Sequence, residues 1–327
     1  MLKLLFIFVI LICTELAYLK IAKATNIKDT PNDRSAHSKP TIRGGGIIAI
    51  ISIIIYFIFY QPNTTEFYFF FSGVFLVSLI SFIDDIVMLS SKIRIITHLI
   101  AFSLVFYSLN LFDIANSYDA ITLVLLFIFS IGFLNIYNFM DGINGITFLN
   151  ALVSYTTLYV INEYYVNFID SQLLIILVLG IIVFGFFNFR KKAICFAGDI
   201  GSITLGFSLI YFVTKIYLET KNLSVFLILT VYLIDGGWTI VERLIRKENV
   251  FNAHKRHLYQ LAANDLKIPH LKISSFYFII QLFINLILVL YLFKSDYRVL
   301  FMFAIFLFFS LLYAVVKRKT LQKLGSK

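Results

Sequence analysis

The chain has 327 residues, of which 60% are hydrophobic and only 14% are charged, and its mean hydropathy is +0.90. A soluble domain carries about a quarter charged residues, so the composition excludes an ordinary soluble protein and favours a polytopic protein in a lipid bilayer. The net charge of +10 is interpreted by location, because membrane proteins concentrate Lys and Arg in cytoplasmic loops. We therefore expect no nucleic-acid partner.

Eleven apolar runs divide the chain. A membrane-spanning helix requires about 20 apolar residues, and the runs that approach this length are 1–19, 46–60, 67–84, 95–111, 119–138, 145–161, 171–188, 201–218, 223–241, 273–293 and 298–316. The first run lacks a small-residue cleavage site, so we interpret it as an uncleaved helix. The pattern predicts an all-α, polytopic integral membrane protein with about 11 transmembrane helices. Residues 1–327 are predicted to form a single transmembrane domain.

Basic residues alternate sharply between successive connecting segments. The segments 61–66, 112–118, 162–170, 219–222 and 294–297 contain only two basic residues, Lys221 and Lys294. The other segments contain most of the Lys and Arg, which places them in the cytoplasm. Eleven spans then put the N-terminus in the periplasm and the C-terminus in the cytoplasm, and we expect the protein in the bacterial inner membrane. The cytoplasmic loops expected to carry the active site are 20–43, 85–94, 138–145, 189–200 and 242–272.

Polar clusters gather on this cytoplasmic side. In chain order they are DTPNDRSAHSKPTIRGGG (29–46), the pair Asp84–Asp85, NIYNFMDGING (135–145), FAGDIGS (196–202) and FNAHKRHLYQ (251–260). The outer segments carry nothing comparable. Their convergence predicts one site at the cytoplasmic surface of the membrane.

The residue types in these clusters favour phosphoryl chemistry. Carboxylate and amide oxygens are ligands that suit Mg²⁺, which also leaves coordination positions for substrate phosphates. The candidates of this kind are Asp84, Asp85, Asp141, Asp199, Asn135 and Asn138. Glycines beside them allow backbone N–H groups to approach phosphate oxygens. The basic residues that could neutralise a polyanion are Arg34, Arg43, Lys92, Arg94, Lys255 and Arg256.

Single motifs have simpler interpretations. An acidic pair at a helix end is most often a solvated terminus. His254 and His257 are spaced i, i+3 beside two basic residues, which favours phosphate binding over zinc binding. Asp235, in LIDGGW near the inner end of a predicted span, is interpreted as a helix-packing polar group.

Taken in order and spacing, the five clusters resemble the polyprenyl-phosphate N-acetylhexosamine-1-phosphate transferases, the MraY/WecA-like superfamily of glycosyltransferase family 4. The resemblance covers nearly the whole chain. The forms DTPNDRSAH and AHKRHLYQ are most similar to the WbpL-type branch, which initiates O-antigen and other surface glycans. The peptidoglycan enzyme MraY is expected to show three successive histidines in the late loop, whereas here Lys255 and Arg256 separate His254 from His257.

The resemblance implies a reaction and a set of roles. The phosphate of undecaprenyl phosphate attacks the β-phosphorus of a UDP-N-acetylhexosamine, and UMP leaves. By resemblance, Asp199 is the principal Mg²⁺ ligand, and Asn138 is a second metal or substrate contact. Asp84 and Asp85 are the pair that activates the acceptor, and Asp141 is an acid near the nucleotide and the metal. Phe196 is a ring that stacks on uracil, and the donor is held by His254, Arg256 and His257. Further binding candidates are Asn135, Arg43, Lys92, Arg94 and Lys255. Mn²⁺ is an alternative metal, and a homodimer is one oligomeric state that the resemblance suggests.

Several alternatives stay open at this stage. An MraY-type phospho-MurNAc-pentapeptide transferase is the nearest one, and the donor sugar is GlcNAc, GalNAc, FucNAc or QuiNAc. A proton-coupled transporter would also use intramembrane acids, although transporters hold their sites near the bilayer midplane between repeated halves. A catalytically inactive lipid- or glycan-binding homologue is a third. Direct displacement is preferred over a double displacement through an aspartyl phosphate.

Overall fold

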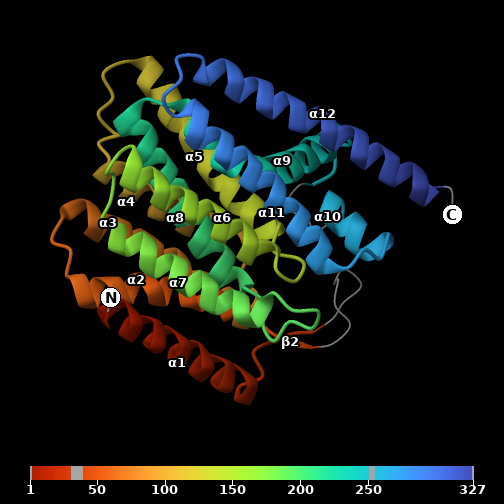
Figure 1. Cartoon of the computed structure of the whole chain (residues 1–327), viewed down its shortest axis with the longest axis horizontal. Helices are drawn as coiled ribbons and strands as arrows, with labels where there is room; N and C mark the ends of the chain where they lie inside the picture. The colour runs from red at the N-terminus through yellow and green to blue at the C-terminus, as the bar shows by residue number, and fades with distance from the viewer. Residues whose placement is uncertain (1, 31–39, 250–254, 326–327) are drawn as a thin grey trace.

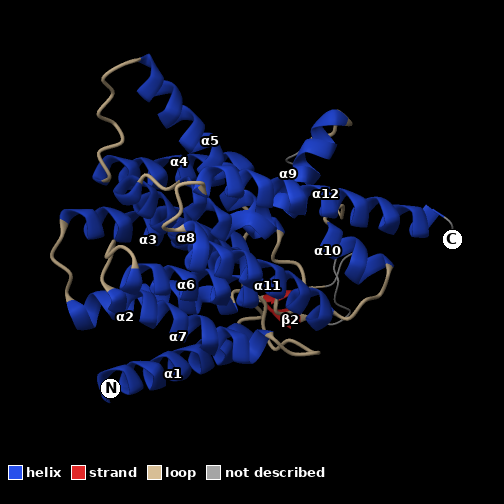
Figure 2. Ribbon diagram, turned by 45° about the horizontal axis from the view of Figure 1, so that its top comes forward, coloured by secondary structure: helices blue, strands red, loops and turns tan. Residues whose placement is uncertain are grey.

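The computed structural model describes residues 2–30, 40–249 and 255–325. These residues form a bundle of helices with a small two-stranded sheet at one end (Figures 1 and 2). In chain order the elements are α1 Leu2–Ala24, β1 Lys28–Asp29, β2 Thr41–Ile42, η1 Gly45–Ile47, α2 Ile48–Tyr60, α3 Thr65–Ile86, α4 Ser91–Ser108, α5 Ser117–Phe139, α6 Ile146–Tyr164, α7 Ser171–Asn188, α8 Gly198–Thr220, η2 Leu223–Leu229, α9 Thr230–Ile245, α10 Leu258–Gln260, η3 Leu261–Asp265, α11 His270–Ile287, η4 Leu288–Leu292 and α12 Arg298–Gly325.

The predicted apolar runs fall on helices along the described chain. Eight helices in the described ranges are long and apolar enough to cross a membrane, and Gly45–Tyr60 is a shorter apolar helix. An all-helical, polytopic membrane protein is therefore confirmed. The number of eleven spans and the orientation of the ends stay predictions. In Figure 1, α1 begins on the left of the molecule and α12 ends on the right.

Polar side chains cap several helices at the end predicted to face the periplasm. Thr64 accepts a hydrogen bond from the N–H of Phe67, Asp170 from Gln172, and Asn222 from Ser224. The first N–H groups of a helix have no partner within it, and lipid cannot supply one. These caps allow α3, α7 and η2 to begin near the membrane boundary.

Helix α8 lies at the centre of the bundle and positions the site. In the apolar 18-residue stretch of this helix, 89% of the residues are buried, the largest share among the candidate spans in the described chain. Ser78 of α3 lies 2.6 Å from Thr204 of α8, oxygen to oxygen, and a side chain at Gly201 would overlap the backbone of Gly46. Because α8 starts at Gly198, its first turn carries Asp199 to the end of the bundle where the polar motifs meet.

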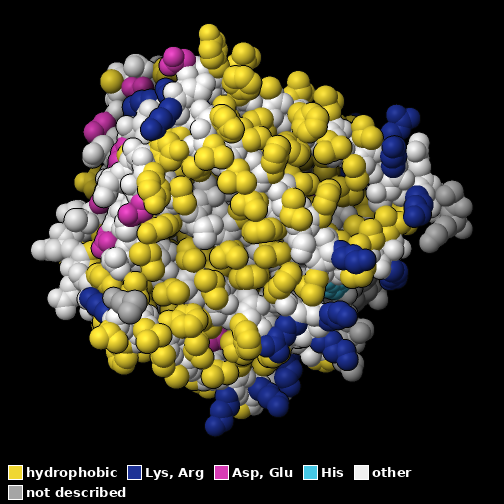
Figure 3. All heavy atoms as spheres, viewed as in Figure 1, with side chains coloured by type: hydrophobic (Ala, Val, Ile, Leu, Met, Phe, Trp, Pro, Cys, Tyr) yellow, Lys and Arg dark blue, Asp and Glu magenta, His cyan; other side chains and the backbone are white. Residues whose placement is uncertain are grey.

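The molecular surface separates apolar and charged regions. On the face shown in Figure 3, hydrophobic side chains cover the middle, Lys and Arg gather toward the lower right, and Asp and Glu lie mainly toward the left. A bilayer around the apolar middle would leave both charged ends in contact with water. This distribution supports the membrane placement that the charge alternation predicts.

Candidate active site

Three carboxylates and two guanidinium groups from four segments meet at the start of α8. Arg43 Nε lies 2.5 Å from Asp85 Oδ1, and Arg43 Nη2 lies 2.8 Å from Asp199 Oδ1. Arg94 Nη1 lies 3.2 Å from Asp84 Oδ2 and 3.8 Å from Asp199 Oδ2. The structure thus brings together five of the sequence-predicted residues, which we call the carboxylate–arginine cluster.

The Asp85 carboxylate caps the first turn of α8. Its Oδ1 accepts the N–H of Asp199 at 2.8 Å and its Oδ2 accepts the N–H of Ile200 at 3.0 Å. Its side chain is 0% exposed. A carboxylate is stabilised at a helix N-terminus by free N–H groups and by the helix dipole. Asp85 therefore fixes the position of Asp199, and both its oxygens are already engaged.

Asp84 differs from its neighbour. Its Oδ1 accepts the N–H of Leu89 at 2.6 Å, and its Oδ2 faces Arg94, whose side chain is 36% exposed. Arg94 also faces Asp199. Asp84 is itself 7% exposed, and unlike Asp85 it contacts no backbone N–H of α8 in the described part of the chain.

Backbone pairing joins the glycine run to the loop before α8. The N–H of Phe196 donates to the carbonyl of Ile42, and the N–H groups of Gly45 and Gly46 donate to the carbonyls of Phe196 and Ala197. The N–H groups of Gly45 and Gly46 are therefore paired with the protein backbone rather than directed at a ligand. The glycines instead permit close packing of the two segments.

Gly198 has the tightest backbone requirement at this junction. Its φ is +71°, and an added Cβ would lie 2.6 Å from Asp85 Oδ2 and 2.7 Å from the backbone nitrogen of Gly44. A side chain would therefore strain the backbone and displace the Asp85 cap.

Asn138 and Asp141 approach the cluster from the end of α5. Ser202 Oγ of α8 lies 3.1 Å from Asn138 Oδ1. Asp141 Oδ1 accepts the Thr147 hydroxyl at 2.5 Å. Burial raises the pKa of Asp141 to about 7, the Thr147 hydrogen bond opposes this rise, and the nearby Asp199 adds to it. Asn135 donates its side-chain N–H to the carbonyl of Ile131 one turn earlier in α5.

Arg43 keeps its charge in this setting. Burial acts to lower the pKa of its guanidinium, but the carboxylates of Asp199 and Asp85 raise it above its ordinary value. A permanently charged group between two acids compensates their mutual repulsion.

The late loop, residues 242–272, is predicted to be cytoplasmic and contains Lys255, Arg256 and His257. Arg256 Nη2 lies 3.0 Å from Glu248 Oε1 and Arg256 Nη1 lies 3.7 Å from Glu242 Oε1. His257 is 1% exposed, and Lys255 is half-buried. Lys92 is exposed, and within the described ranges the ion pairs of the carboxylate–arginine cluster come from Arg43 and Arg94. His254 and Arg34 lie outside the described residues.

The oxygen donors at the cluster fit a hard cation. No group of three His, Cys, Asp or Glu side chains suited to a metal occurs among the described residues. Mg²⁺ does not require one, since it binds through one or two carboxylates together with substrate phosphates. The Asp199 carboxylate, which faces Arg43 and Arg94, and the Asn138 amide oxygen, which faces the Ser202 hydroxyl, are donors of the appropriate kind.

One supporting residue is not indicated by the sequence analysis. Asn188, at the end of α7, accepts the N–H of Gly145 at 2.8 Å and donates to the carbonyl of Cys195 at 3.0 Å, so it connects two motif loops. Asp235 packs against hydroxyl groups of α11 and α12 as predicted, and it also contacts the segment that follows His257. An acid within an apolar span was the available signal, because such a group needs partners.

Comparison with known proteins gives consistent matches. The model of the family Glycosyl transferase family 4 matches residues 67–217. A probable undecaprenyl-phosphate N-acetylglucosaminyl 1-phosphate transferase of Bacillus subtilis is 24% identical over 276 residues, 79% of this chain and 77% of the relative. A phospho-N-acetylmuramoyl-pentapeptide-transferase of Streptococcus mutans is 32% identical over 152 residues, 41% of this chain and 44% of the relative. The corresponding Streptococcus pyogenes protein is 35% identical over 100 residues, 30% of this chain and 29% of the relative.

Proposed function

We propose that this chain, which belongs to the MraY/WecA-like superfamily of polyprenyl-phosphate sugar-1-phosphate transferases, transfers N-acetylhexosamine-1-phosphate from a UDP-sugar to undecaprenyl phosphate. The carboxylate–arginine cluster is the observation that carries the proposal. It lies at the end of the central helix, next to the apolar surface, where a membrane-bound phosphate and a soluble nucleotide can meet. The products are UMP and a lipid-linked pyrophosphoryl sugar.

The reaction is a displacement at phosphorus. An acceptor phosphate oxygen forms a bond to the donor's β-phosphorus, and the bond from that phosphorus to the oxygen of UMP breaks. A phosphate monoester has a second pKa of about 6, so the acceptor is already largely ionised at pH 7 and requires little general-base assistance. Catalysis then depends mainly on positioning and charge neutralisation.

We assign the acceptor contact to Asp84 rather than to Asp85. Both oxygens of Asp85 hold the start of α8, whereas Asp84 shares with Asp199 the guanidinium of Arg94, whose side chain is 36% exposed. Asp84 orients the acceptor phosphate through Arg94 or takes its last proton, and Arg43 and Arg94 offset the negative charge. We prefer direct displacement, since the ionised acceptor needs no covalent intermediate on the protein. Isolation of a phosphoenzyme formed on Asp84 with donor alone would overturn it.

Asp199 and Asn138 would hold Mg²⁺, with Mn²⁺ as an alternative. When bound, the ion supplies a Lewis acid that neutralises the donor diphosphate. Arg43 and Asp85 position Asp199 from the protein side.

The donor is assigned to the side formed by Phe196, Asp141 and the late loop. Phe196 is half-buried in the loop before α8, and the family resemblance supports the proposal that its ring stacks on uracil. The name of the Bacillus subtilis relative favours N-acetylglucosamine as the sugar. The AHKRHLYQ form favours a WbpL-type role in initiating a surface glycan such as O-antigen, at the inner membrane.

A peptidoglycan role is the second candidate. It is favoured by the 32% identity to the Streptococcus mutans enzyme within the matched region. The separated histidines His254 and His257 argue against it. The two functions differ in donor, so UDP-MurNAc-pentapeptide belongs in the substrate test beside the simple UDP-sugars.

The experiment is UMP release by the purified full chain with undecaprenyl phosphate, Mg²⁺ and a UDP-sugar. We expect UMP to appear only when donor and lipid are both present, and EDTA to abolish it. Proton- or sodium-coupled flux in proteoliposomes without UMP release would favour the transporter instead.

A further inference from the structure

Asp235 of α9 is a buried carboxylate with four hydrogen-bond donors. Oδ1 accepts the N–H of Leu258 at 2.9 Å and the Tyr313 hydroxyl at 3.1 Å. Oδ2 accepts the Tyr277 hydroxyl at 2.6 Å and the N–H of Tyr259 at 3.3 Å. These donors come from α10, α11 and α12, so a single side chain connects four helices.

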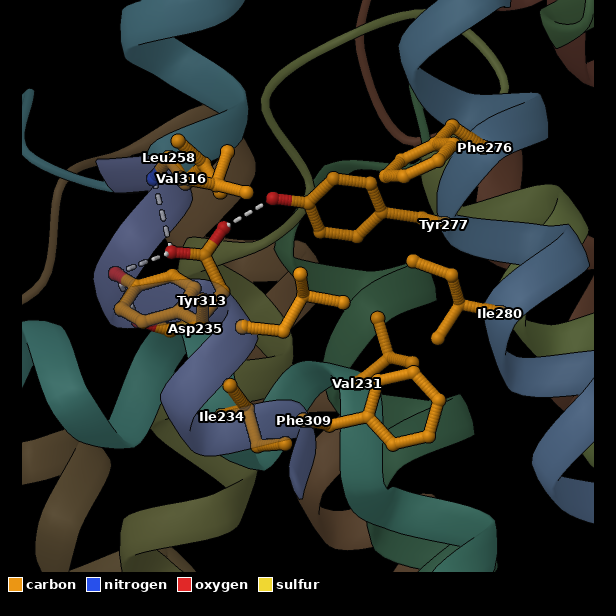
Figure 4. A pocket seen from close by; sticks show the side chains of 11 residues that line it. Val231, Ile234, Asp235, Leu258, Phe276, Tyr277, Ile280, Phe309, Tyr313 and Val316 are labelled. Carbon is orange, nitrogen blue, oxygen red and sulfur yellow. Dashed lines mark hydrogen bonds between the residues drawn. The ribbon is translucent and has the colours of Figure 1, made fainter. Parts of the chain in front are cut away.

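The surroundings explain why these donors are needed. Figure 4 shows the Asp235 carboxylate beside a pocket of about 120 Å³, with the hydroxyl groups of Tyr277 and Tyr313 directed toward it. Apolar side chains form most of the remaining lining, including Val231, Ile234, Phe276, Ile280, Phe309 and Val316. Asp235 is 1% exposed. A buried carboxylate is costly without hydrogen-bond partners, so its presence fixes the groups that donate to it.

The groups that it fixes include the backbone directly after His257. His257 precedes α10, and its Nδ1 lies 3.7 Å from Asp235 Oδ1. Because Asp235 binds the next two N–H groups, it determines both where the chain turns after His257 and what lies against the imidazole ring.

The other side of this segment contacts the Asn138–Asp141 region. The Tyr259 hydroxyl donates to the carbonyl of Phe139 at 2.7 Å, and Tyr259 is 0% exposed. An added Cβ at Gly142 would lie 2.2 Å from the Tyr259 hydroxyl oxygen, so the glycine leaves room for the ring. The segment 257–259 is therefore held between Asp235 and the end of α5.

The last helix extends the same support. Lys317 Nζ of α12 donates to the Tyr313 hydroxyl at 2.9 Å and lies 2.8 Å from Glu242 Oε2. Glu242 also faces Arg256. Helix α12 thus supports both the Asp235 site and the Arg256 side of the late loop.

We propose that Asp235 is a positioning residue, which places the His257 segment against the Asn138–Asp141 side of the active site. The role rests on the proposed function, because this segment is assigned to donor binding. Asp235 does not touch the substrate itself. It acts through the N–H groups of Leu258 and Tyr259.

The first test is Asp235→Asn in the purified full chain, with steady-state kinetics for both substrates. Asn has one oxygen and one NH₂ group where Asp has two acceptors, so at least one backbone donor loses its partner. A displacement on the order of 1 Å at an active site changes rates by about 10- to 100-fold. We expect kcat/KM for the donor to fall within that range while KM for undecaprenyl phosphate changes less than about twofold.

Two further variants provide a second test of this role and a control. Leu258→Pro removes the N–H that bonds Asp235 and also replaces a leucine side chain that lines the pocket. The backbone accepts proline because His257 has φ −62° and ψ 143° and Leu258 is the first residue of α10. This variant is expected to reproduce the donor-selective loss, and it serves as the test if Asp235→Asn does not fold. Tyr313→Phe removes a donor to the same carboxylate that is not part of the 257–259 segment, and it is the matched control, with a smaller fall in donor kcat/KM than Asp235→Asn.

Hydrogen–deuterium exchange without substrates separates this inference from the proposed function. In Asp235→Asn, or in Leu258→Pro, a peptide covering 255–262 should exchange about tenfold faster, the change expected from losing one hydrogen bond. Unchanged exchange overturns the positioning role, whether or not the wild-type chain releases UMP. An equal fall in donor and lipid kcat/KM, or a Tyr313→Phe loss as large as that of Asp235→Asn, also overturns it.

Discussion

Replacing Asp85 with Asn should destabilise the protein more than the same change at Asp84. Asp85 accepts two backbone N–H groups of α8 and pairs with Arg43, and its side chain is fully buried. Asn retains one acceptor oxygen, so at least one of these three interactions is lost and a new NH₂ group faces a donor.

The magnitude follows from the contacts. Removing one partner of a buried ion pair costs about 3–5 kcal/mol. Arg43 keeps Asp199 as a second partner and is 30% exposed, so we expect the lower end, about 3 kcal/mol including the lost N–H bond. Asp84→Asn can keep its bond to the N–H of Leu89, and its ion partner Arg94 is 36% exposed, so about 1 kcal/mol is expected there.

The assay uses Cys195, which is buried beside the α8 junction, whereas Cys13 is exposed. In a Cys13→Ala background, a thiol-reactive fluorescent dye reports unfolding in detergent as Cys195 becomes accessible. The midpoint of denaturation should fall clearly for Asp85→Asn and only slightly for Asp84→Asn. Equal midpoints, or a larger loss for Asp84→Asn, would refute the assignment of Asp85 to holding α8.

Four further predictions concern single sites. Asp199→Asn should abolish Mg²⁺-dependent UMP release without loss of folded protein, and full activity would contradict the metal assignment. Combined Lys255→Ala and Arg256→Ala should weaken donor binding far more than lipid binding in binding assays, and an unchanged donor affinity would count against a pyrophosphate role. Gly198→Ala should cost about 1–3 kcal/mol in the same denaturation assay because of its positive φ, whereas Gly132→Ala, with no atom within 4 Å of the added Cβ, should cost nothing. Burial raises the pKa of Asp141 from 3.8 to about 7, so its contribution to the stability of the metal-free protein is full below pH 3.8 and is lost as the pH rises to about 7; Asp141→Asn should make that pH dependence shallower, and a slope as steep as in the wild type would contradict it.

The helical membrane architecture can be predicted from the sequence because each spanning helix is determined by the hydropathy of its own segment. Each apolar run is long enough to specify its own helix, and the positions of the basic residues predict which ends lie together. The convergence of Asp84, Asp85 and Asp199 follows from topology alone. That reasoning needs no knowledge of side-chain contacts.

The different roles of Asp84 and Asp85 could not be predicted from the sequence. Two adjacent carboxylates have the same chemistry, and only the position of α8 distinguishes Asp85, which caps it, from Asp84. Likewise, the donors to Asp235 lie at positions 258, 259, 277 and 313, in three other helices. No periodicity in the sequence relates residues so far apart, so its role was visible only after the helices were placed.

The most direct test of the central claim is a panel of UDP-sugars with undecaprenyl phosphate and Mg²⁺, scored for UMP and for the lipid product. The panel contains UDP-GlcNAc, UDP-GalNAc, the deoxy sugars UDP-FucNAc and UDP-QuiNAc, and UDP-MurNAc-pentapeptide. We predict stoichiometric UMP and lipid-linked pyrophosphoryl sugar with at least one simple UDP-N-acetylhexosamine, and neither product in EDTA or with Asp199→Asn. Absence of UMP with every donor, or UMP formed without lipid, would contradict the assignment of this chain as a sugar-1-phosphate transferase.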